Sequence, residues 1–142
     1  AEVANHALQQ GWQVWLFGSD KDQPVTANIQ QLTQQRCVDL AGKTKLGEAI
    51  DLMSLCHTVI SNDSGLMHVA AALDKKLIAI YGSSDPKHTP PMHPQAVVEY
   101  LGLSCSPCFK RTCPLGHLNC LRQLQPATLL SKLSLITLKA GQ

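Results

Sequence analysis

The sequence VISNDSGLMH, residues 59–68, sets the architecture because it passes from a strand to a helix through one sharp polar break. The segment Thr58 to Ser61 is β-branched and apolar, which predicts a buried strand. Beyond the break, four apolar residues recur at the spacing of one helix face: Leu66, Val69, Ala70 and Leu73. The free N–H groups at the start of that helix would point outward at the carboxyl end of the sheet. Open α/β sheets bind ligands there, and helix N-termini favour anions.

Strands and helices alternate on both sides of these residues. Apolar runs predict further strands at residues 12–17, 37–40, 77–81 and 96–100. Helical spacing predicts helices at residues 3–8, 20–32, 46–53 and 126–138. In the helix at 20–32, Val25, Ile29 and Leu32 are predicted to form one buried stripe. The alternation predicts an α/β fold with a Rossmann-like, doubly wound, mostly parallel sheet.

Length and composition exclude several classes of function. The 142 residues suffice for one domain with a sizeable core, expected to span residues 1–142. A net charge of +2, with only two each of Trp, Tyr and Phe, argues against nucleic-acid binding. No apolar run approaches the roughly 18 residues of a membrane span, and the first residues are no signal peptide. We therefore expect a cytoplasmic protein.

The polar break holds candidate ligand-binding side chains. Ser64 and His68 lie one turn apart on the predicted helix and can face one ligand, while Gly65 allows its close approach. Asp63 can accept hydrogen bonds from sugar hydroxyls, and His68 can donate one to a phosphate oxygen. The alternative is structural: Asp63 or Ser64 caps the helix, and His68 is a surface histidine. The combination of these residues at a strand-to-helix turn favours function.

Two further loops are predicted on the same edge of the sheet. Gly18 and Asp20 follow the first strand, and Lys43 and Thr44 precede a helix that Thr44 is placed to cap. Each loop by itself is weak evidence, because any such turn needs Gly with Ser, Thr or Asp. The Gly-Lys-Thr run is not a phosphate-binding P-loop, since that motif needs a Gly where Cys37 stands.

The loop at residues 82–94 follows the strand at 77–81 and ends on the same edge. In it, Lys87, His88 and Thr89 could reach a phosphate or an acceptor. The alternative is that its prolines simply exclude a helix.

Five stretches carry a resemblance to a known family: SNDSGLMHVAAAL (61–73), YGSSDP (81–86), TPP (89–91), LAGKT (40–44) and CSPCFKRTCPLGH (105–117). Together they closely resemble the ADP-heptose:lipopolysaccharide heptosyltransferases, and the last two resemble the heptosyltransferase II branch. The resemblance covers nearly the whole chain, and its Asp-Ser-Gly block is the most specific part.

The resemblance implies a GT-B architecture, in which two Rossmann-like domains face a cleft. This chain looks like the C-terminal, donor-binding domain, and its start without Met in a predicted helix agrees with a missing N-terminal part. The implied reaction transfers heptose from ADP-heptose to the lipopolysaccharide inner core, with inversion and with neither a cofactor nor a catalytic metal. The acceptor site and the catalytic base would lie in the absent N-terminal domain, so the fragment would hold no catalytic residue. The implied location is the cytoplasmic face of the inner membrane.

The resemblance also implies roles for individual residues at the turn. Asp63 resembles the family aspartate that holds the donor sugar. Ser64 and Gly65 resemble the main-chain donors at the diphosphate, and His68 matches a histidine near that diphosphate on the same helix. The helix N-terminus would stabilise the charge that develops on the leaving ADP without a metal.

A second set of implied roles concerns the nucleoside. Thr44, beside Lys43, sits where the family's main chain meets adenine, and Asp20, after Gly18, sits near an acidic residue that meets ribose. These residues do not exclude the alternative of a GT-B transferase that uses another nucleotide sugar.

Four of the six cysteines form a Cys-x2-Cys-x4-Cys-x6-Cys run around His117, in a family-like insertion at about residues 103–122: Cys105, Cys108, Cys113 and Cys120. Four thiolates could hold zinc, but the spacing differs from paired zinc knuckles and from common iron–sulfur patterns. Disulfides, redox-labile thiols and reduced structural thiols are the alternatives. A noncatalytic α/β binding module organised by these cysteines is therefore a rival function. Cys37 and Cys56 are expected to be small core residues.

Overall fold

The computed structural model describes residues 1–138. These residues form two compact units, Ala1–Leu52 and the part of the chain from Met53 onward. The predicted α/β class is confirmed, because parallel strands alternate with helices along the chain. Over residues 1–138, no helix has both the length and the apolar character needed to cross a bilayer.

The first unit contains short elements joined by polar loops. They are α1 (Glu2–Gln9), β1 (Trp15–Leu16), the 3₁₀ turn η1 (Asp20–Asp22), α2 (Gln23–Leu32), β2 (Val38–Asp39) and the start of α3 (Leu46–Ser54). Strands β1 and β2 pair in parallel, with Trp15 opposite Val38. The predicted strand at 12–17 is therefore confirmed only over two residues.

Helix α2 buries a different face from the predicted one. Val25 and Leu32 are 61% and 57% exposed, so the predicted apolar stripe is wrong, and Ile29 alone of the three is partly buried. The buried positions are Thr26 within the helix and Thr33 at its C-cap, at 5% and 0% exposure. The Thr33 hydroxyl donates to the Ile29 carbonyl at 2.9 Å. A threonine that satisfies its hydroxyl within the helix can be buried at small cost, which apolar periodicity does not detect.

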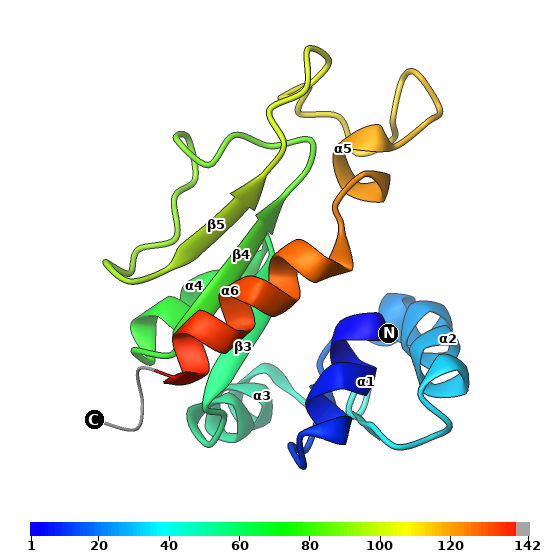
Figure 1. The fold of residues 1–142 in the computed structure, drawn as a ribbon, viewed down its shortest axis with the longest axis vertical. Helices are drawn as coiled ribbons and strands as arrows, with labels where there is room; N and C mark the ends of the chain where they lie inside the picture. Colours follow the sequence, from blue (N-terminus) through cyan, green and yellow to red (C-terminus); the bar gives the residue numbers. More distant parts are fainter. Residues whose placement is uncertain (139–142) are drawn as a thin grey trace. The chain divides into compact units, whose positions relative to one another are not determined.

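The second unit is a three-stranded parallel sheet of order β3-β4-β5 with helices on it. Its elements are β3 (Thr58–Asn62), α4 (Gly65–Ala72), β4 (Lys76–Tyr81), β5 (Val97–Tyr100), α5 (Asn119–Arg122) and α6 (Pro126–Leu138). In Figure 1, α6 crosses in front of these strands and α4 lies behind them. The sheet is thus covered on both faces, as the continuous apolar run in β4 predicts.

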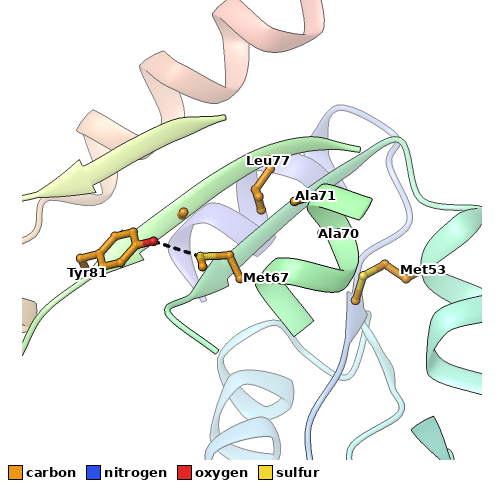
Figure 2. Close-up of a cluster of buried hydrophobic side chains, with 7 residues drawn as sticks. Met53, Met67, Ala70, Ala71, Leu77 and Tyr81 are labelled. Atoms are coloured by element: carbon orange, nitrogen blue, oxygen red, sulfur yellow. Dashed lines mark hydrogen bonds between the residues drawn. The ribbon is translucent and has the colours of Figure 1, made fainter. Parts of the chain in front are cut away.

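The core of this unit gathers between α4 and the sheet. Its buried members are Met53, Met67, Ala70, Ala71, Leu77, Ala79 and Tyr81, and most of them are labelled in Figure 2. On α4 the predicted face is only partly right: Ala70 is fully buried, while Leu66, Val69 and Leu73 are partly buried around the core. The segment GLMHVAAA is apolar nearly all round, so its periodicity leaves the direction of the buried face open.

Candidate functional site

The turn between β3 and α4 presents the start of a helix at the carboxyl end of a parallel strand. Strand β3 ends at Asn62 and α4 begins at Gly65, so Asp63 and Ser64 form the whole connection. Ser64 is extended, with φ −153° and ψ 170°, and occupies the N-cap position without a capping bond from its side chain. Its hydroxyl lies 3.3 Å from the hydroxyl of Ser61. Of the structural alternative, in which Asp63 or Ser64 caps the helix and His68 is a surface histidine, capping by the Ser64 side chain is therefore wrong.

Asp63 is held by two hydrogen bonds from different parts of the second unit. Its main-chain N–H donates to the Ile80 carbonyl at 3.1 Å, which ties the turn to the end of β4. Its carboxylate oxygen Oδ2 accepts a hydrogen bond from the Thr89 hydroxyl at 3.0 Å. The residue is half-buried. Thr89 occupies one carboxylate oxygen, and the other can accept further hydrogen bonds.

Tyr81 lies behind this contact and was not predicted as part of the site. Its side chain is fully buried, and its hydroxyl donates to the Thr89 carbonyl. The same hydroxyl lies 3.4 Å from the sulfur of Met67 on α4, as the dashed line in Figure 2 shows. Burial, with a smaller contribution from the charge of Asp63, raises the pKa of Tyr81 to about 12. The phenol is therefore neutral at physiological pH and remains a hydrogen-bond donor.

Gly65 and His68 occupy the open side of the same helix. A Cβ atom built on Gly65 would meet no other atom within 4 Å, and the residue is exposed. The His68 side chain is also exposed, one turn along α4. Within the second unit, the structure therefore brings together all four residues predicted at this turn: Asp63, Ser64, Gly65 and His68.

The loops after β1 and β2 meet within the first unit. The Gly42 N–H donates to the Gly18 carbonyl at 2.9 Å. Gly42 has φ +69°, and a Cβ on it would lie 2.2 Å from Oδ1 of Asp20. The predicted neighbours Gly18 and Asp20 therefore lie directly against the loop that carries Lys43.

The carboxylates of η1 have different surroundings. Oδ2 of Asp22 accepts hydrogen bonds from both the N–H and the hydroxyl of Ser19, each at 2.7 Å. The Ser19 hydroxyl is the larger cause of a lowered pKa for Asp22. Asp22 thus stabilises the turn, while the side chain of Asp20 is exposed.

The start of α3 corrects the predicted role of Thr44. The helix begins at Leu46, so Lys45 rather than Thr44 directly precedes it, and the Glu48 carboxylate accepts a hydrogen bond from the Lys45 N–H at 2.7 Å. A carboxylate three residues into the helix can satisfy that N–H as well as a capping hydroxyl does. The Lys43 ammonium group donates to the Asp39 carbonyl at 2.9 Å.

Comparison with known proteins adds the family. Residues 1–119 match glycosyltransferase family 9 (heptosyltransferase). The chain belongs to this family.

Individual relatives agree with the family match. The chain is 38% identical to lipopolysaccharide heptosyltransferase 2 of Salmonella typhimurium, over 99% of this chain and 42% of that protein. It is 48% identical to lipooligosaccharide heptosyltransferase 2 of Haemophilus influenzae, over 69% of this chain and 30% of that protein. The solved structure of E. coli ADP-heptose lps heptosyltransferase II superposes with a TM-score of 0.85 at 35% identity, covering 99% of this chain and 41% of that one. The family 9 chain thus spans about two fifths of the Salmonella and E. coli relatives.

The proline-rich loop of this family 9 chain uses its three predicted polar residues differently. Thr89 turns to Asp63. The His88 ring makes an edge contact with Phe109, with ring centroids 5.9 Å apart. The Lys87 N–H donates to the Asp85 carboxylate at 2.8 Å. Of the three, Thr89 reaches the site through a side-chain hydrogen bond, which its Thr-Pro-Pro setting did not indicate.

The cysteine-rich segment surrounds a cavity of about 120 Å³. Four thiols line it together with His117: Cys105, Cys108, Cys113 and Cys120. All four are unpaired thiols. Within residues 1–138, no three His, Cys, Asp or Glu side chains are arranged to hold a metal ion. Main-chain N–H groups, chiefly that of Leu118, lower the pKa of Cys113.

The two remaining cysteines were expected in the core. Cys37 is buried, at 7% exposure, as predicted. Cys56 is only half-buried, and its partial burial raises its pKa.

Proposed function

We propose that this chain is the donor-binding part of a heptosyltransferase and binds ADP-heptose. The observation that carries the proposal is the Asp63–Ser64–Gly65 turn, where an orientated carboxylate stands beside the N-terminus of α4. A sugar diphosphate needs both features side by side: an acceptor for sugar hydroxyls and N–H donors for phosphate oxygens. The heptosyltransferase names of the relatives support the choice of sugar.

In the proposed complex, each residue of the turn has a separate task. The free carboxylate oxygen of Asp63 accepts hydrogen bonds from heptose hydroxyls. The N–H groups of Ser64, Gly65 and Leu66 bind the diphosphate, where the missing Cβ of Gly65 allows a phosphate oxygen to come close. His68 donates to another phosphate oxygen. The helix N-terminus stabilises the negative charge that grows on ADP as the glycosidic bond breaks, so the transfer proceeds without a metal.

The loops of the first unit are the proposed nucleoside-binding part. The Asp20 carboxylate would accept hydrogen bonds from ribose hydroxyls. The main chain at Lys43 and Thr44 would contact adenine, and the Gly18–Gly42 hydrogen bond fixes the shape of these loops.

The remaining parts of the reaction are assigned outside this chain. We propose that an N-terminal domain of the enzyme binds the lipopolysaccharide inner core and supplies the catalytic base. The whole enzyme then acts at the cytoplasmic face of the inner membrane. The fragment alone is then expected to bind its donor without transferring heptose, with inversion occurring in the whole enzyme.

Calorimetric titration of the chain with ADP-heptose, ADP and UDP tests the proposal. We expect heat of binding with ADP-heptose and ADP, and none with UDP. The substitution Asp63→Ala should weaken ADP-heptose binding, and in the full-length enzyme it should reduce transfer by about 100-fold or more, because a charged hydrogen bond to the reacting sugar is lost. Equal binding of ADP and UDP would favour another nucleotide-sugar transferase. Binding of none of the three would favour the noncatalytic module.

The substitution Gly65→Ala adds a steric test at the same turn. The added methyl group meets no atom of the chain, so folding should be unaffected while a phosphate oxygen is kept away. Gly47→Ala is the matched control, because its methyl group also meets open space but lies on α3. Unchanged ADP affinity in Gly65→Ala would contradict the assigned diphosphate site.

A further inference from the structure

The orientation of Asp63 depends on a residue from a separate loop. Thr89 lies 26 positions later in the chain, yet its hydroxyl donates to Oδ2 of Asp63 at 3.0 Å. A carboxylate attached by a short side chain can rotate about its last bond, which exchanges the roles of its two oxygens. A hydrogen bond to one oxygen restricts this rotation. The lone pairs of the other oxygen then point in a fixed direction.

Thr89 is itself held from two sides. Its N–H donates to the Asp85 carbonyl at 3.1 Å, and its carbonyl accepts a hydrogen bond from the Tyr81 hydroxyl. Tyr81 is fully buried on β4, so its hydroxyl ties the Thr89 carbonyl to the most buried strand of the unit.

The Tyr81 hydroxyl also lies 3.4 Å from the sulfur of Met67, which is fully buried on the first turn of α4. The contacts therefore form a closed circuit: from Asp63 to Thr89, from Thr89 to Tyr81, from Tyr81 to Met67, and along α4 back to the turn. Figure 2 shows the step from Tyr81 to Met67. Buried, fully satisfied polar networks of this kind rigidify the groups they join.

We propose that Thr89 is a positioning residue, which orients the Asp63 carboxylate toward the donor sugar and so governs recognition of the sugar rather than of the nucleotide. This inference rests on the proposed function, and it assigns the proline-rich loop to selection of the sugar. Tyr81 supports Thr89 by donating a hydrogen bond from its hydroxyl to the main-chain carbonyl of Thr89. This bond persists throughout the physiological pH range because the phenol stays protonated.

The test compares the affinities of each variant for ADP-heptose and for ADP by calorimetry. Thr89→Val keeps the shape of the side chain and removes the hydroxyl. We expect about tenfold weaker binding of ADP-heptose, the size expected for a lost hydrogen bond to a charged group, with ADP affinity unchanged. Thr89→Ser restores the hydroxyl and should recover wild-type affinity to within about twofold. Tyr81→Phe should give a smaller loss, because the Asp85 contact still holds the Thr89 main chain.

Four outcomes would overturn the inference. Equal weakening of ADP and ADP-heptose in Thr89→Val would mean that the loop only supports the fold, and unchanged affinities would mean that Asp63 needs no positioning. Failure of Thr89→Ser to rescue would exclude the hydroxyl as the cause. If the wild-type chain binds ADP and ADP-heptose equally well, the sugar makes no contribution and the inference about Thr89 fails while nucleotide binding stands. If it binds neither, the proposed function itself fails, which distinguishes the two. Circular dichroism of each variant establishes that it is folded.

Discussion

The two units bury different kinds of side chain. In Ala1–Leu52, the buried residues are small or polar: Thr26, Thr33, Cys37, Ala41 and Ala49. From Met53 onward, large and mostly apolar side chains are fully buried as well, namely Tyr81, Met53, Met67, Leu77 and Ile78, beside the small Ala70 and Ala79. The strands also differ in length: β1 in the first unit has two residues, and β4 in the second has six.

The difference shows two ways to hold a site. In the first unit, side chains add hydrogen bonds to the main chain next to β2: the Gln30 amide donates to the Cys37 carbonyl at 2.7 Å and accepts from the Cys37 N–H at 3.2 Å. The Thr26 hydroxyl contacts the Asp39 carboxylate at 3.1 Å. In the second unit, burial of apolar surface fixes the strand and helix that frame Asp63. Substitutions in the two units should therefore act through different interactions and at different cost.

The largest loss of stability is expected for Leu77→Ala on β4. Leu77 is fully buried, so the free energy of unfolding should fall by about 3 kcal/mol through lost transfer energy and a cavity. Leu55→Ala is the control, because Leu55 is 74% exposed. Urea unfolding followed by circular dichroism measures the effect. Similar losses for the two variants would contradict an apolar core centred on β4.

A smaller loss is expected for Gly42→Ala in the first unit. The positive φ and the close approach of Asp20 should together cost about 2 kcal/mol. Both tryptophans, Trp12 and Trp15, lie in this unit, so their fluorescence during urea unfolding reports on it. Gly47→Ala on α3 should be neutral or slightly stabilising, because its methyl group meets open space. A neutral Gly42→Ala would mean that the two loops are not held together as described.

The smallest loss is expected for Thr33→Val, which replaces a buried hydroxyl by a methyl group of similar size. The hydroxyl bonds the Ile29 carbonyl at 2.9 Å, so its removal should cost about 1 kcal/mol in the same fluorescence experiment. Thr112→Val serves as the control, because Thr112 is exposed. If Thr33→Val increased stability, the first unit would have a core governed by apolar burial like that of the second, and the contrast between the units would disappear.

Prediction from sequence succeeded where a pattern is local. The strand, turn and helix around Asp63 lie where β-branched residues, a polar break and helical spacing place them, and α6 spans the predicted Pro126–Leu138. It failed for the buried face of α2 and was only partly right for that of α4. Thr33 is polar by type yet buried because its hydroxyl is satisfied. Met67 stands in a helix too apolar for its spacing to select one face.

The candidate site divides in the same way. Composition and spacing are sufficient to identify the Asp63–Ser64–Gly65 turn, because neighbouring residues indicate the end of a strand, a glycine and the start of a helix. Local sequence patterns do not predict the hydrogen bond from Thr89 to Asp63 or the position of the Tyr81 hydroxyl behind it. They arise because β3 pairs in parallel with β4, which brings the loop after Tyr81 to the same sheet edge as the turn after Asn62. A contact across 26 residues depends on strand order, and strand order is set by the packing of the whole unit rather than by any local pattern.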